Sequence, residues 1–93
     1  MTVLFGPAAR PRLPRGVKLH HDAVRDTWML LAPERAFEID EVAATVLQLC
    51  DGHRAFGAIV DDLAVRYAAD RAEIAADVQA MLGDLAEKRV LEP

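Results

Sequence analysis

The pattern of apolar and polar positions divides the chain into three zones. Residues 1–16 show no period, and their prolines interrupt any continuous helix or strand. Residues 17–39 contain short apolar runs separated by turn signals, and apolar residues recur at helical spacing from Asp40 onwards. We therefore expect a flexible Pro/Arg-rich arm over residues 1–16 and a single folded domain over residues 17–93.

The middle zone predicts three short strands in a meander. The apolar runs cover residues 17–21, 27–32 and 36–39, with polar turns between them. In the third run Phe37 and Ile39 share one face. Because the meander stops there, this strand is expected to form an edge of the sheet whose outward backbone groups lack partners.

Three helices are predicted after the strands. Asp40 is a candidate N-cap of the first helix, and Gly52 stands where a left-handed C-terminal cap is expected. The second helix covers about residues 55–68, and the third runs from a capping box at Asp70 to about Lys88. This order predicts an α+β fold, a winged helix-turn-helix-like domain in which a three-stranded antiparallel sheet is followed by three helices.

The third helix has a core stripe and two flanks. The stripe is apolar and consists of Ile74, Val78, Met81 and Leu85. One flank has small or uncharged side chains, namely Ala75, Gln79, Leu82 and Ala86. The other flank is charged and consists of Asp77, Asp84 and Lys88. Periodicity leaves open whether the uncharged flank forms a shallow groove or packs on the first helix, and only one flank can face a partner.

Charge argues against a nucleic-acid partner. The net charge of −4 combines +3 over residues 1–36 with −7 over residues 37–93. From Asp70 to Lys88 the third helix carries two basic and five acidic residues, a net charge of −3. A recognition helix in a DNA groove needs the opposite sign, so a winged-helix DNA-binding regulator is the weaker alternative.

The sequence offers no arrangement that suggests catalysis or a metal site. It contains no Ser, which excludes a serine nucleophile, and no Gly-rich phosphate loop. His20 and His21 point to opposite faces of a strand, so they cannot chelate one ion together. Asp61 and Asp62 diverge by about 100° on a helix. We therefore predict that the chain is not an enzyme and has no cofactor.

The sequence also predicts a cytoplasmic protein without a membrane span. No window reaches 18 apolar residues, and the first arginines follow the short apolar start, the reverse of a secretory signal. The single Cys50 cannot form an internal disulfide, which fits a reducing compartment.

Four segments, in this order and spacing, resemble the PqqD family of small chaperone-like proteins in pyrroloquinoline quinone (PQQ) biosynthesis. They are LLAPERAFEID at 30–40, LQLCDG at 47–52, IVDDLAVRY at 59–67 and DVQAMLGDL at 77–85. The resemblance covers about residues 15–91. It has two departures, because Asp40 stands where the family often has Asn and Arg89 where the family often has Gly.

The resemblance implies a RiPP recognition element, a module that binds the precursor peptide of a ribosomally made and modified peptide. The implied partners are the precursor peptide PqqA and PqqE, a radical S-adenosylmethionine enzyme that links a Glu and a Tyr side chain within PqqA. The iron-sulfur clusters belong to PqqE. The quoted segments do not decide between PQQ biosynthesis and another peptide-modifying pathway.

The family's peptide is expected to add as a strand beside the third strand and to lie over the third helix. The expected contacts on the edge are Arg35, Ala36, Phe37, Glu38 and Ile39. They are joined by one of the two flanks of the third helix described above. Arg35 and Arg54 are the candidate partners for acidic peptide side chains. The open edge together with the arm also allows a homodimer.

Overall fold

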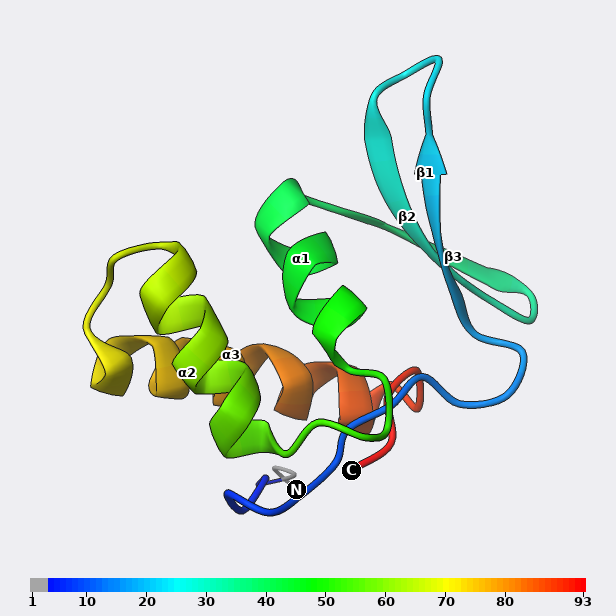
Figure 1. Cartoon of the computed structure of the whole chain (residues 1–93). Coiled ribbons are helices and arrows are strands. Elements are labelled where there is room, and N and C mark those ends of the chain that lie inside the picture. Colours follow the sequence, from blue (N-terminus) through cyan, green and yellow to red (C-terminus); the bar gives the residue numbers. More distant parts are fainter. Residues whose placement is uncertain (1–3) are drawn as a thin grey trace.

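The computed structural model describes residues 4–93, and it has three strands followed by three helices (Figure 1). The elements are β1 (Lys18–Asp22), β2 (Thr27–Ala32), β3 (Arg35–Ile39), α1 (Glu41–Leu49), α2 (Phe56–Arg66) and α3 (Arg71–Glu87). The strands form one antiparallel sheet in the order β1-β2-β3. The predicted α+β fold is therefore confirmed.

Within the described residues, no helix combines the length and the apolar character that crossing a membrane would require.

The register of the sheet places one face against the helices. Leu30 in the central strand lies opposite Leu19 of β1 and Phe37 of β3. Its side chain has no exposed surface, and the other two are half-buried against the same core. The turn between β1 and β2 projects away from the helices (Figure 1). One face of the sheet thus packs against the helices, and β3 is an edge strand.

Both predicted N-caps are present. The carboxylate of Asp40 accepts a hydrogen bond of 2.7 Å from the backbone N–H of Ala43 at the start of α1. Asp70 accepts bonds from Ala72 and Glu73, at 2.7 and 3.4 Å, at the start of α3. Each carboxylate satisfies N–H groups that have no partner within the helix.

The prediction for Gly52 is wrong in its location. Helix α1 ends at Leu49, so Gly52 does not follow the last helical residue. It does adopt a left-handed conformation, with φ at +81°, but its N–H donates to the carbonyl of Pro11 at 3.0 Å. A Cβ here would lie 3.3 Å from that of Arg12. The glycine therefore lets the N-terminal segment approach closely.

The N-terminal segment is part of the fold from residue 4, where the sequence predicted a flexible arm over residues 1–16. Phe5 is 4% exposed and stacks on Phe56, with ring centroids 5.8 Å apart. Further along, Arg12 exchanges two backbone hydrogen bonds with Glu92, of 2.9 and 2.8 Å. Residues 1–3 of the predicted arm lie outside the described part of the chain.

The same segment caps α2, whose N-cap residue Ala55 makes no side-chain bond. The N–H of Phe56 donates to the carbonyl of Ala9 at 2.7 Å, and the N–H of Gly57 donates to that of Pro7 at 3.0 Å. Proline lacks an N–H but keeps its carbonyl acceptor. Backbone carbonyls of the N-terminal segment thus satisfy the N–H groups at the start of α2.

Candidate functional site

The outer edge of β3 is open: no strand of residues 4–93 pairs with it. A two-residue turn joins Ala32 to Arg35, and the closing pair of such a hairpin exchanges both backbone hydrogen bonds. Along an antiparallel ladder, hydrogen-bonded residue pairs alternate with pairs that are not hydrogen-bonded. The backbone groups of Phe37 and Ile39 therefore also form hydrogen bonds with β2. The N–H and C=O groups of the intervening Ala36 and Glu38 are therefore directed away from β2. They offer hydrogen bonds to a further strand.

The beginning of β3 contacts the end of α3. The guanidinium of Arg35 donates to the backbone carbonyl of Lys88 at 2.8 Å. Both cations lie over the Phe37 ring, with Arg35 Cζ at 5.7 Å and Lys88 Nζ at 6.0 Å from its centroid. Lys88 also pairs with Asp84 at 2.9 Å. The structure thus brings four of the proposed site residues together.

The uncharged flank of α3 faces the interior and the N-terminal segment. Leu82 has no exposed surface, and Ala75 and Ala86 pack against the core. The amide of Gln79 accepts from the N–H of Phe5 at 2.7 Å and donates to its carbonyl at 3.0 Å. This flank is therefore occupied within the chain, whereas Lys88 of the charged flank contacts β3 at the Phe37 ring.

An apolar hollow of about 120 Å³ lies between the three helices. Seven of its lining side chains are apolar or aromatic: Val42, Val46, Leu63, Tyr67, Ile74, Val78 and Met81. The eighth lining residue is Asp77, whose carboxylate has no hydrogen bond or ion pair within residues 4–93. Val42 and Tyr67 at its rim are 53% and 41% exposed, so the hollow is open to solvent.

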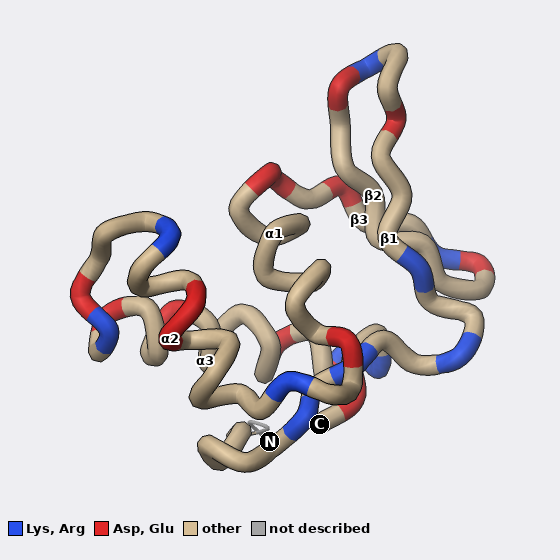
Figure 2. The backbone as a smooth tube through the Cα atoms, viewed as in Figure 1, with Lys and Arg blue, Asp and Glu red and all other residues tan. Residues whose placement is uncertain are grey.

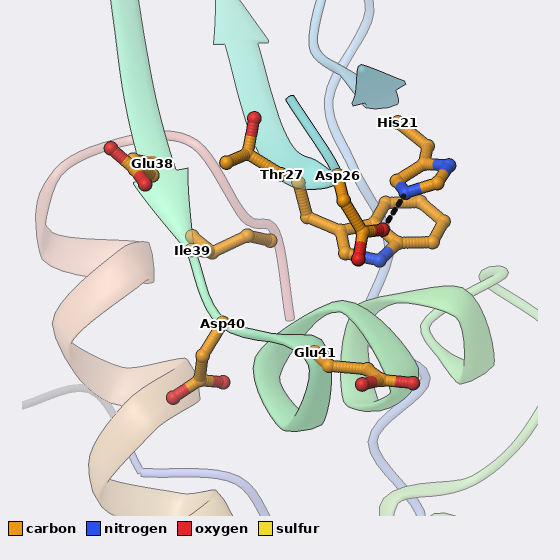
Figure 3. A pocket seen from close by; sticks show the side chains of 8 residues that line it. His21, Asp26, Thr27, Glu38, Ile39, Asp40 and Glu41 are labelled. Atoms are coloured by element: carbon orange, nitrogen blue, oxygen red, sulfur yellow. Dashed lines mark hydrogen bonds and ion pairs between the residues drawn. The ribbon is translucent and has the colours of Figure 1, made fainter. Parts of the chain in front are cut away.

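A second hollow, of about 440 Å³, lies at the far end of β3 (Figure 3). One wall is Trp28, against which the His21 ring stacks at 4.6 Å between centroids. His21 pairs with Asp26 at 3.1 Å. In Figure 3, Asp40 is directed to the side of α3, whereas Glu41 is directed to the opposite side. Asp40 therefore lies on the side of this hollow that faces α3.

Charge is distributed unevenly around these hollows. Figure 2 shows acidic segments where β3 passes into α1, and basic segments near the start of β1 and the β2–β3 turn. Among the residues that the structure describes, no Lys or Arg lines either hollow. The nearest cations on α2 and α3 are engaged, because Arg66 pairs with Asp62 and Arg71 with Asp61. The surface around Asp77 therefore carries a negative charge that no neighbouring Lys or Arg among residues 4–93 neutralises.

Two neighbouring titratable groups have shifted pKa values. Burial and the neighbouring Asp51 carboxylate raise the pKa of Cys50 to about 12, so its thiol stays protonated. Hydrogen bonds from the N–H groups of Arg54 and His53 lower the pKa of Asp51. Within residues 4–93, no three His, Cys, Asp or Glu side chains converge to hold a metal ion.

Sequence reasoning found the β3 edge but missed the apolar hollow. It assigned Ile74 and Met81 to the core stripe, and both are only half-buried. The floor of a groove and the floor of a core are both apolar, so helical periodicity does not separate them. The exposed position of Val42 at the rim carries no sequence signal of its own.

Comparisons with known proteins place the chain in one family. The family sequence model "Coenzyme PQQ synthesis protein D (PqqD)" matches residues 27–91. A relative from Rhodopseudomonas palustris (strain BisB5), named "PqqA binding protein", is 56% identical over 89 residues, which cover 96% of this chain and 87% of that protein.

Two solved structures share the fold. The NMR structure of the PqqD part of Methylobacterium extorquens PqqCD, described as a RiPP recognition element, has a TM-score of 0.82 at 49% identity, covering 96% of this chain and 95% of that one. TbiB1 in complex with the TbiA(β) leader peptide has a TM-score of 0.75 at 26% identity, covering 87% and 94% of the two chains. The sequence match and the shared fold together show that this chain belongs to the PqqD family.

Proposed function

We propose that this chain is a cytoplasmic peptide chaperone of PQQ biosynthesis, which binds PqqA by strand addition to β3 and presents it to PqqE. The open edge of β3 beside α3 is the observation that carries the proposal. The names of the relatives support PqqA as the peptide. A related fold in complex with a leader peptide supports peptide binding as the activity.

The edge supplies backbone hydrogen bonds, and the helices supply an apolar surface. Side chains of an added strand alternate between two faces, so every second one is directed toward α3. Phe37, Ile39 and the apolar hollow then form one surface beneath the peptide, flanked by Asp84 and Lys88. The buried flank with Gln79 and Leu82 takes no part in this proposal.

These contacts give binding of intermediate strength. Four or five main-chain hydrogen bonds contribute about 1 kcal/mol each, and a buried apolar side chain contributes about 1.5 to 3 kcal/mol. Ordering a flexible peptide offsets several kcal/mol of this gain. A Kd near 1 μM, about −8 kcal/mol, is therefore expected. Such binding allows the peptide to be released to an enzyme.

Proline substitution tests strand addition directly. Ala36→Pro and Glu38→Pro each remove an N–H that is directed away from β2, so the ladder within the sheet is retained. We expect each to weaken binding of PqqA by about five-fold, the equivalent of one hydrogen bond of about 1 kcal/mol. Isothermal titration calorimetry measures the change.

Ala36→Val is the matched control, because it changes the same side chain and keeps the N–H. Thermal unfolding followed by circular dichroism shows whether each variant folds. Unchanged affinity in two folded proline variants would rule out addition to this edge. A backbone NMR titration with PqqA, followed by PqqE, then tests presentation: signals of β3 move with the peptide, and a second set moves with the enzyme.

A further inference from the structure

We propose that the peptide carries a Lys or Arg next to the apolar side chain that fills the hollow, and that Asp40 and Asp77 bind this cation. The inference rests on the proposed function and specifies which peptides the groove accepts. It also fixes the direction in which the peptide lies.

The apolar hollow sets the first part of the requirement. Its volume of about 120 Å³ suits one side chain of the size of Val or Leu, and its seven apolar or aromatic lining residues exclude a charged one. Asp77 is the eighth lining residue, and it is exposed and has no partner within residues 4–93. A cation beside the apolar anchor would therefore meet a free carboxylate at the rim.

Asp40 supplies a second carboxylate at the same end. It directly follows β3, precedes Val42 of the hollow by two residues, and is directed to the side of α3 (Figure 3). One of its oxygens accepts the bond from Ala43, and the other has no partner among the described residues. The N-terminus of a helix carries a partial positive charge that attracts a carboxylate. The start of α1 therefore fixes the position of the Asp40 side chain.

Within residues 4–93, no Lys or Arg forms an ion pair with either carboxylate. Arg66 and Arg71, the basic residues nearest along α2 and α3, pair with Asp62 and Asp61. Lys88 lies about 16 Å along α3 from Asp77, at the other end of the surface between β3 and α3. Arg35 lies beside it and donates to its backbone carbonyl. The two ends of the groove thus differ in charge, and a cationic peptide residue is attracted to the end at Asp77.

The test combines peptide and protein variants. Each Lys and Arg of PqqA is replaced singly by Gln, and binding to the full chain is measured by calorimetry at 20 and 300 mM salt. We expect one replacement to weaken binding by about five- to ten-fold at low salt and by less at high salt. In the double variant Asp40→Asn/Asp77→Asn, the same replacement has little further effect. Asn at position 40 still caps α1.

The matched control Glu34→Gln/Glu87→Gln removes two exposed charges that form no ion pair within residues 4–93, so it frees no cation and should leave the effect of the peptide replacement intact. Equal affinity of all Gln peptides for the unmodified chain would overturn the inference, as would an unchanged effect in the Asp40/Asp77 double variant. Either result leaves strand addition standing. Absence of any binding by PqqA would refute the proposed function itself.

A nitroxide at either end of PqqA provides an independent measurement of direction. The label on the end nearer the identified cation should broaden the NMR signals of Asp40 and Asp77. The label on the other end should broaden those of Arg35 and Lys88. The reverse pattern would contradict the inference even if the cation contributes to affinity.

Discussion

Arg89 holds a backbone conformation that glycine adopts more easily. Its φ is +63°, and its N–H donates to the carbonyl of Ala86 at 3.0 Å. The next residue, Val90, donates to the carbonyl of Leu85 at 3.1 Å. These two bonds form the Schellman motif, in which the left-handed residue is usually Gly. The departure from the family at this position therefore changes the side chain and keeps the helix end.

Arg89→Gly should raise the free energy of unfolding by about 1 kcal/mol, because it relieves the steric cost of a Cβ in the left-handed region. Urea denaturation of the two proteins measures the difference. Arg89→Ala, which removes the same charge and keeps the Cβ, should show no such gain. If both variants gain equally, the removed charge and not the backbone explains the effect.

At the scale of elements, the strands and helices were predicted closely because their boundaries have local causes. Asp40 and Asp70 cap helices through their own side chains, and the turn after Ala32 separates two apolar runs. The role of residues 5–12 depends on backbone carbonyls that bond to residues far along the chain. A pattern of side chains does not report such bonds.

The side-chain pattern is equally unable to show which flank of α3 belongs to the candidate site. Both flanks lie beside the apolar stripe, and periodicity gives no reason to prefer one. The uncharged flank is covered because Gln79 binds the backbone of Phe5, 74 residues away in the sequence. The edge at Phe37 was predictable because a meander must end in an edge strand.

Phe5→Ala should lower the free energy of unfolding by about 3 kcal/mol, since it removes a buried aromatic ring from the core. Leu4→Ala is the matched control, because Leu4 is 73% exposed; it should change stability by less than about 0.5 kcal/mol. Chemical denaturation compares the two. Equal small effects would show that the N-terminal segment does not contribute to the core.

At the scale of the whole molecule, one buried thiol links the core to alkaline stability. Cys50 is 4% exposed, and its thiol donates to the carbonyl of Val46 at 3.4 Å. Its pKa is about 12 in the folded chain, against 9.0 for an unperturbed thiol. Between these values the unfolded chain loses a proton that the folded chain keeps, so rising pH favours unfolding.

We therefore expect the free energy of unfolding to fall by up to about 1.4 kcal/mol per pH unit above pH 9 on account of this group. In Cys50→Ala this part of the slope disappears, although the variant is less stable at every pH through lost packing. Denaturation curves from pH 7 to 11 give both slopes. Parallel slopes above pH 9 would mean that the thiol ionises without opening the core.

The N-terminal segment also decides how the protein can be shortened or labelled. A fragment that begins at Val17, where the strands start, would lack the ring beneath Phe56 and the two carbonyls at the start of α2. Its core would be open to water on that side, which favours aggregation. A purification tag or fluorescent partner is therefore best attached ahead of residue 4, through a linker that leaves Phe5 free to reach its site.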